Sequence, residues 1–167
     1  MIVIVFGLPG SGKSYFARKF ADLINADYIS SDRVRKEMLN STTYSGKEKL
    51  SVYDEMLMRM KRLIRENRSV VIDATFYLDK IRKKFSREES NIFFIEVKAD
   101  EQVIIERLKR KRSDSNADFE VYKKIKQQWE PMCEPHLLLQ STDANIGDML
   151  NKASVSFPLN HDQRTNK

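Results

Sequence analysis

The chain has 167 residues, of which 41% are hydrophobic and 32% are charged, so its length fits one domain with a sizeable core. No apolar run approaches the roughly 18 residues of a membrane span, and Ile2–Phe6 is too short and lacks the basic residues of a signal peptide. The single cysteine, Cys133, excludes an internal disulfide, and we expect a cytoplasmic protein. The net charge of +6 permits an anionic partner such as nucleic acid, although many basic proteins bind none.

Apolar runs separated by helical patterns predict the fold. Several runs are continuous rather than alternating, as in strands that are covered on both faces. The predicted strands are Ile2–Phe6, Tyr28–Ser30, Val70–Ala74, Ile92–Val97 and Leu137–Gln140. Their alternation with helices predicts a mostly parallel, three-layer α/β sheet, which binds ligands beyond the carboxyl ends of its strands. We assign residues 1–153 to a single domain and expect residues 154–167, which are polar and without a period, to be a flexible tail.

The first strand leads into GLPGSGKS at Gly7–Ser14, which matches the P-loop pattern G-x-x-x-x-G-K-[ST], and a helical pattern follows at once. Glycines leave the backbone N–H groups free to wrap phosphates, and the helix N-terminus adds partial positive charge. In this motif Lys13 reaches the β- and γ-phosphates, and the Ser14 hydroxyl coordinates Mg²⁺. We therefore expect ATP or GTP to bind at Gly7, Gly10, Ser11, Gly12, Lys13, Ser14 and Tyr15.

The second predicted strand is followed by an acid and a base, in YISSDRVRKEML at residues 28–39. Asp32 and Arg35 are three residues apart, which places them on one face of a helix. If this strand neighbours the P-loop strand, Asp32 lies near the γ-phosphate and could accept a proton from an acceptor hydroxyl. Arg35 beside it could hold an acidic group of the acceptor. Alternatively, Asp32 stabilises the helix N-terminus and Arg35 is a solvated partner.

The third predicted strand ends in a carboxylate, Asp73, within SVVIDATF. A carboxylate at this place holds Mg²⁺ in P-loop proteins, often through water, so we expect Ser14 and Asp73 to share the metal. A turn or capping aspartate is the alternative. Phe76 and Tyr77, which follow, could stack on a base or pack in the core. The next helical pattern, Asp79–Arg87, is basic and could track a phosphate backbone or form a solvated face.

Arginines crowd the end of a later helical pattern, in IERLKRKRSDSNADFEVY at residues 105–122. Two helices that are joined by a polar turn and rich in arginine are typical of a lid, which we place at about residues 107–120. A lid excludes water from the γ-phosphate and supplies positive charge to the transition state. The candidates for that charge are Arg107, Arg110 and Arg112, and a basic helix end that faces solvent is the alternative.

Taken in order, the P-loop, SSDRVRKEM, VVIDATF and the arginine-rich lid resemble the P-loop kinase group of the phage-type polynucleotide 5′-hydroxyl kinases, an AAA-type ATP-binding kinase domain. Zeta-toxin-like and gluconate-kinase-like enzymes are relatives. The resemblance covers about residues 1–150 and implies an adenylate-kinase-like parallel sheet of strand order 2-3-1-4-5 with a helical lid. It also implies that Asp32 is the general base, that Arg35 binds an acceptor phosphate and that a lid arginine acts in catalysis. In the polynucleotide kinases the third strand ends in serine–aspartate–threonine–asparagine, whereas here Asp73 is displaced by one position and the asparagine is lost.

These features predict an ATP-dependent kinase that transfers the γ-phosphoryl group to a hydroxyl acceptor and uses ATP and Mg²⁺. The acceptor could be a nucleic-acid 5′-hydroxyl or a small molecule such as a nucleoside, a sugar or an antibiotic. A nucleotide-binding switch without an acceptor is a further hypothesis, under which replacing Asp32 leaves nucleotide turnover unchanged. We expect the adenine near the loop after the fifth strand, around Ser141–Asn145, and the sequence assigns no oligomeric state.

Overall fold

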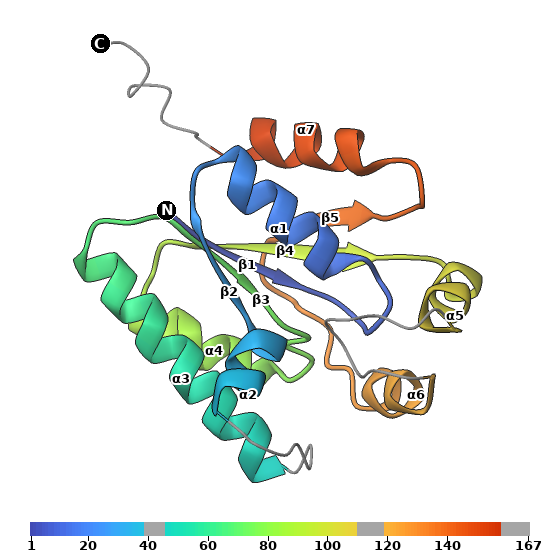
Figure 1. Ribbon diagram of the computed structural model, residues 1–167, viewed down its shortest axis with the longest axis horizontal. Helices are drawn as coiled ribbons and strands as arrows, with labels where there is room; N and C mark the ends of the chain where they lie inside the picture. The colour runs from blue at the N-terminus through green and yellow to red at the C-terminus, as the bar shows by residue number, and fades with distance from the viewer. Residues whose placement is uncertain (39–45, 110–118, 158–167) are drawn as a thin grey trace.

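The computed structural model describes residues 1–38, 46–109 and 119–157 (Figure 1). The strands are β1 (Ile2–Phe6), β2 (Asp27–Ser30), β3 (Val70–Asp73), β4 (Ile92–Lys98) and β5 (Leu137–Gln140). The helices are α1 (Lys13–Leu23), α2 (Ser31–Met38), α3 (Gly46–Arg65), α4 (Asp79–Glu88), α5 (Glu101–Lys109), α6 (Phe119–Gln127) and α7 (Ile146–Ser156). Each predicted strand is therefore present, with its ends displaced by one residue at most.

The strands form one parallel sheet in the order β2-β3-β1-β4-β5, which confirms the predicted order. In the central strand β1, Ile4 is in register with Ile72 of β3 and Phe94 of β4. Every residue of β1 and β3 is buried, because helices cover both faces of the sheet. The carboxyl ends of parallel strands meet at one edge, so the P-loop, the start of α2 and Asp73 are brought together there.

Two layers of helices enclose the sheet. In Figure 1, α1 and α7 lie on one side of it, and α3 and α4 lie on the other. The core beneath α1 and α7 includes Val5, Phe16, Phe20, Met149 and Ala153. The core beneath α3 and α4 includes Phe6, Met56, Met60, Ile72 and Phe85. The sheet is thus a rigid platform from which the loops of its carboxyl edge project.

The domain extends past the predicted boundary at residue 153. Helix α7 continues to Ser156, and Phe157 is buried against aromatic side chains of α1 and β4. Met149, Ala153 and Phe157 are four residues apart and lie in one core cluster, which is the spacing of a buried helix face. The prediction of a tail from residue 154 is therefore wrong for its first residues, and residues 158–167 lie outside the described part of the chain.

Helices α5 and α6 lie beyond the carboxyl edge of the sheet, at the right of Figure 1. Most of the predicted lid, including Arg110 and Arg112, falls between them and lies outside the described residues. Among the helices that the structure describes, none combines the length and the apolar character needed to cross a membrane.

Candidate active site

A cavity of about 190 Å³ lies at the carboxyl edge of the sheet, between the P-loop and helices α2, α3 and α6. It is lined by residues from segments that are far apart in the sequence. Predicted site residues that line it are Gly10, Lys13, Ser14, Asp32, Arg35 and Asp73. The fold therefore brings the proposed phosphate-binding, metal-binding and proton-accepting groups into one space.

The P-loop backbone adopts conformations that favour glycine. Gly12, which precedes α1, has a φ of 93°, and Gly7 has a φ of 154°. A Cβ atom on Gly12 would lie 2.7 Å from Oγ of Ser141, and one on Gly7 would overlap the carbonyl oxygen of Val97. The motif indicates glycines because phosphates must approach the backbone. The structure adds a second reason, because a side chain at Gly7 or Gly12 would also collide with the protein itself.

Arg107 contacts the P-loop backbone and does not line the cavity. Its Nη1 donates to the carbonyl oxygens of Gly10 at 3.4 Å and Ser11 at 3.2 Å, and to Oγ of Ser141 at 3.1 Å. Its Nε and Nη2 both lie 2.9 Å from Oδ1 of Asp143. In this position Arg107 fastens the P-loop to the segment after β5, which differs from the predicted role of a lid arginine. The sequence did not indicate these partners, because they are more than 30 residues away.

The remaining predicted nucleotide-binding side chains lie on different sides of the P-loop. Ser11 is buried, and its Oγ has no hydrogen-bond partner within the described structure. Tyr15, in the first turn of α1, is 58% exposed, and the Lys19 ammonium lies 5.5 Å from the centre of its ring. Tyr15 does not line the cavity, whereas Lys13 and Ser14 do.

Asp73, at the end of β3, is buried beside Lys13 and Ser14. The Tyr28 hydroxyl donates to its Oδ2 at 2.7 Å, whereas Oδ1 has no hydrogen-bond partner in the part of the chain that the structure describes. Burial raises the pKa of Asp73, while the Lys13 ammonium and the Tyr28 hydroxyl act in the opposite direction. A free carboxylate oxygen beside a serine hydroxyl fits the oxygen ligands that Mg²⁺ prefers.

Asp32 and Arg35 face the cavity from α2, although β3 lies between β2 and the P-loop strand. Nη1 of Arg35 donates to Oδ1 of Asp32 at 3.1 Å, and its Nε lies 3.1 Å from Oε1 of Glu48 on α3. Arg35 and Glu48 are largely buried, whereas 36% of the Asp32 side chain is exposed. Arg35 is therefore no solvated partner: it fixes the direction of Asp32 and leaves that carboxylate accessible.

The loop after β3 brings Thr75 and Tyr77 to the cavity. Within this loop Phe76 has a left-handed φ of 44°, and its N–H donates to the Tyr53 hydroxyl at 3.1 Å. The Phe76 ring is fully buried and packs against the rings of Tyr53 and Phe85. The structure thus places Phe76 in the core, and the hypothesis that its ring stacks on a base is wrong.

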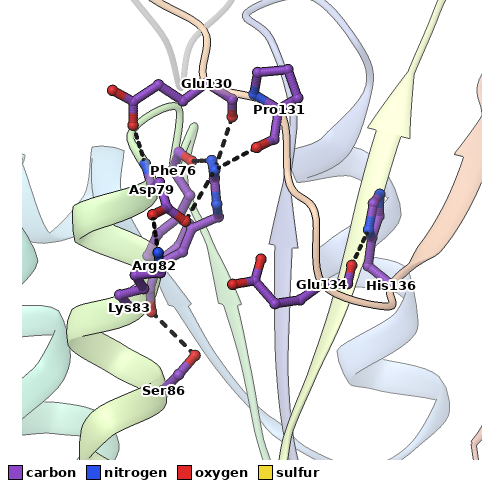
Figure 2. A network of polar contacts seen from close by, with 9 residues as sticks. All are labelled: Phe76, Asp79, Arg82, Lys83, Ser86, Glu130, Pro131, Glu134 and His136. Atoms are coloured by element: carbon purple, nitrogen blue, oxygen red, sulfur yellow. Dashed lines mark hydrogen bonds and ion pairs between the residues drawn. The ribbon is translucent and has the colours of Figure 1, made fainter.

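Arg82 of α4 holds the same loop through its guanidinium (Figure 2). Nη1 donates to the carbonyl oxygen of Phe76 at 2.7 Å, and Nη2 donates to the carbonyl oxygens of Glu130 at 2.8 Å and Pro131 at 3.2 Å. Its side chain is only 2% exposed. Helix α4 is therefore more than a solvated or phosphate-tracking basic helix, because Arg82 joins the loop after β3 to the segment after α6.

Residues 2–132 match the model of a protein family described as an AAA domain. The chain belongs to this AAA domain family. Uncharacterized proteins of Mycobacterium tuberculosis and Mycobacterium bovis are 34% identical to this AAA domain over 87 residues, which are 45% of the chain and only 18% of their length. A UPF0200 protein of Thermococcus onnurineus is 30% identical over 138 residues, which are 72% of the chain and 74% of that protein.

Solved structures of kinases share the fold of this AAA domain. A sugar kinase from Janibacter sp. HTCC2649 has a TM-score of 0.74 at 14% identity and covers 92% of both chains. Kti12 of Chaetomium thermophilum in complex with ADP-AlF3 has a TM-score of 0.67 at 19% identity, over 93% of this chain and 98% of its own. The APS kinase of Mycobacterium tuberculosis in complex with AMPPNP and APS has a TM-score of 0.67 at 18% identity, over 92% and 95%. This likeness shows the α/β P-loop fold, and membership of the polynucleotide kinase group stays a prediction.

Proposed function

We propose that this chain is an ATP-dependent kinase that transfers the γ-phosphoryl group to a hydroxyl acceptor. The observation that carries the proposal is a single cavity lined by Lys13 and Ser14 of the P-loop and by the Asp32 carboxylate. A site that only binds nucleotide needs the first two residues, whereas transfer to a hydroxyl also needs a proton acceptor, a role that the partly exposed Asp32 carboxylate can fill. Nucleotide complexes of proteins with the same fold, Kti12 with ADP-AlF3 and APS kinase with AMPPNP, support the use of ATP.

In the proposed reaction, the P-loop amides and Lys13 bind the phosphates and stabilise the charge that develops on the γ-phosphoryl oxygens. The acceptor oxygen forms a bond to the γ-phosphorus, and the bond from that phosphorus to the bridging oxygen of ADP breaks. The proton of the acceptor hydroxyl passes to the Asp32 carboxylate. Arg35, which holds Asp32 at 3.1 Å, keeps this carboxylate in position and contributes positive charge to the acceptor side.

Ser14 and Asp73 are the proposed ligands of Mg²⁺, directly or through water, and the unpartnered Oδ1 of Asp73 supports this assignment. Among the described residues, no group of three or more histidine, cysteine, aspartate or glutamate side chains could hold a metal alone. The remaining ligands would therefore come from the nucleotide and from water. When bound, the ion neutralises charge on the phosphate oxygens.

We place the adenine beside the segment after β5, next to the contacts of Arg107 with Ser141 and Asp143. The contacts of Arg107 with both the P-loop and this segment bring the two together, which supports the placement. Arg107 then positions the loop, and Arg110 and Arg112 stay the candidates for a lid arginine that contacts the phosphoryl group.

Transfer from γ-labelled ATP to a panel of 5′-hydroxyl oligonucleotides and small hydroxyl compounds tests the proposal. With the compound of the panel that accepts the phosphoryl group, Asp32→Asn should lower kcat by about 10²- to 10⁴-fold, the range of general-base catalysis. The affinity for ATP should be retained. Asp22→Asn is the matched control, because Asp22 is exposed on α1, outside the cavity.

Three outcomes separate the hypotheses. Turnover of ATP without transfer to any acceptor, unchanged in Asp32→Asn, would overturn the kinase proposal in favour of a nucleotide-dependent switch. Transfer to oligonucleotides with a steep salt dependence would identify a polynucleotide acceptor. Transfer to a small compound with little salt dependence would identify a metabolite kinase.

A further inference from the structure

Two lysines, Lys49 of α3 and Lys124 of α6, line the cavity from different helices. The Lys49 ammonium lies 5.5 Å from the centre of the Tyr77 ring, which also lines the cavity. The carboxylates nearest to this wall, Asp32 and Glu48, are both engaged with Arg35. Within the described ranges, neither lysine has a carboxylate at ion-pair distance. The acceptor side of the cavity thus carries positive charge that the protein compensates only in part, through the nearby Glu48.

The electrostatics of Lys49 agree with this geometry. Burial lowers the pKa of Lys49, and repulsion from Lys124 and from Arg35 lowers it further, while attraction to Glu48 acts in the opposite direction. Cations that repel one another in a partly buried site raise the free energy of the empty protein. A bound anion would remove that repulsion and form charge-assisted hydrogen bonds with both ammonium groups.

We propose that Lys49 and Lys124 form an anion subsite, so that the acceptor is a hydroxyl compound that also carries a phosphate, carboxylate or sulfate group. The inference rests on the proposed kinase function, since the same cavity receives the acceptor. In this arrangement Asp32 takes the hydroxyl proton, the two lysines bind the anion, and the Tyr77 ring forms an apolar wall beside it. A neutral acceptor would leave the repulsion between the two lysines in place.

The phosphates of the nucleotide are a less suitable occupant of this subsite. Lys13 and the P-loop amides already provide for them, at the N-terminus of α1. Lys49, in contrast, follows directly on Glu48, the partner of Arg35, and therefore stands with the acceptor-binding residues of α2 and α3. The two lysines consequently select the acceptor rather than ATP.

A binding experiment tests the subsite without phosphoryl transfer. The protein is saturated with AMPPNP and Mg²⁺ to fill the P-loop, and its unfolding temperature is measured with sodium sulfate or with sodium chloride at equal ionic strength. Sulfate should raise the unfolding temperature of the wild type and of the controls Lys47→Gln and Lys123→Gln, whose lysines lie on the same helices outside the cavity. The rise should be lost in Lys49→Gln and Lys124→Gln. No rise in the wild type, or an equal rise in all variants, would overturn the subsite.

A kinetic experiment tests its role in substrate choice. Matched acceptors are compared as pairs, gluconate with glucose and a nucleoside 3′-phosphate with its nucleoside, together with a 5′-hydroxyl oligonucleotide. The anionic member should have the higher kcat/KM by about tenfold or more, and each Lys→Gln change should reduce that preference about tenfold by raising the acceptor KM. The KM for ATP should stay unchanged, and an increase in it would show that the lysines serve the nucleotide instead.

The two experiments distinguish failure of the subsite from failure of the proposed function. Lysine-dependent stabilisation by sulfate, with no transfer to any acceptor, would contradict the kinase function and leave the anion subsite standing. Equal transfer to neutral and anionic acceptors would contradict the subsite and leave the kinase function standing. Preference for the oligonucleotide over the small anions would identify the anion as a backbone phosphate.

Discussion

The Tyr28 hydroxyl on β2 donates a 2.7 Å hydrogen bond to Oδ2 of Asp73 on the neighbouring strand β3. Burial raises the pKa of Tyr28, and the adjacent Asp73 carboxylate raises it further, so the phenol remains a hydrogen-bond donor at neutral pH. The bond occupies one oxygen of Asp73, and the other has no partner among the described residues. Tyr28 therefore sets the orientation of the proposed magnesium ligand.

Tyr28→Phe removes this donor and leaves a buried carboxylate oxygen without a partner. The free energy of unfolding at neutral pH should fall by about 1–3 kcal/mol, which is the cost of leaving a buried polar group unsatisfied. Nucleotide binding should also require a higher Mg²⁺ concentration, because Asp73 is no longer oriented. Denaturant titration and an Mg²⁺ titration with a fluorescent ATP analogue measure the two effects. An unchanged Mg²⁺ midpoint would contradict the orienting role.

Asp73→Asn should change how stability depends on pH. The pKa of Asp73 is raised in the folded protein, so the stability associated with its protonated form is present at low pH and is lost as pH rises through the folded pKa. Asparagine has no such dependence. We therefore compare the unfolding temperatures of Asp73→Asn and the wild type in EDTA and without nucleotide. The difference, variant minus wild type, should increase from about pH 4 to pH 8, by about 2–4 °C for each kcal/mol of stability that the wild type loses. A constant difference would show that the pKa of Asp73 is ordinary.

Gly12→Ala tests the backbone requirement of the P-loop. The φ of 93° and the approach of Ser141 Oγ to 2.7 Å from a Cβ atom both oppose a side chain here. We expect a loss of at least about 1 kcal/mol in stability, from the left-handed conformation alone, and a strong loss of ATP affinity. Gly147→Ala in α7 is the matched control, because its Cβ atom would meet nothing within 4 Å. That change should be neutral or stabilising.

Arg107→Ala tests whether the P-loop depends on its anchor. The variant loses the contacts to two P-loop carbonyl groups, so the dissociation constant of ATP should rise by about tenfold, equivalent to roughly 1.4 kcal/mol. Lys109→Ala, on the exposed end of the same helix, is the control. A double-mutant cycle with Asp143→Ala should give a coupling energy of about 0.5–1 kcal/mol, because the carboxylate of Asp143 is largely exposed. Unchanged ATP binding in Arg107→Ala would contradict the anchoring role.

Arg82→Met should be among the most destabilising changes in α4. It leaves the carbonyl oxygens of Phe76, Glu130 and Pro131 without their buried donor, at a cost of about 3 kcal/mol in the free energy of unfolding. Lys83→Met, at the next position, removes only an exposed ion pair with Asp79 and should cost far less stability. Denaturant unfolding of the two variants checks the contrast, and equal losses would show that the buried bridge is unimportant.

The strands, the P-loop and Asp73 could be predicted because each is encoded in a short segment, whereas the strand order was implied by the resemblance to P-loop kinases. Buried strands give continuous apolar runs, and the loop motif and the carboxylate stand at the ends of such runs. The end of α7 was missed, although the spacing of Met149, Ala153 and Phe157 was a usable signal. The prediction of a tail relied instead on the polar character of residues 154–167 and on the absence of a period in them.

The partners of the site residues could not be predicted in this way. Glu48 reaches Arg35 from another helix, and Tyr28 reaches Asp73 from another strand, so their roles depend on tertiary packing. Arg82 has the same local sequence context as its exposed lysine neighbours, and it is buried by tertiary contacts with Phe6, Phe76 and the segment after α6. Helical periodicity marks a face of a helix but does not say which basic residue on it meets carbonyl groups.

The bridge made by Arg82 links the loop after β3 to the segment after α6. Its guanidinium donates hydrogen bonds to main-chain oxygens of both segments. The Glu130 N–H adds a further 2.9 Å hydrogen bond to the carbonyl oxygen of Tyr77. The segment that leads from α6 toward β5 is thereby held to the loop that follows Asp73. The two segments are thus mechanically coupled, because neither can move away from the other without breaking these hydrogen bonds.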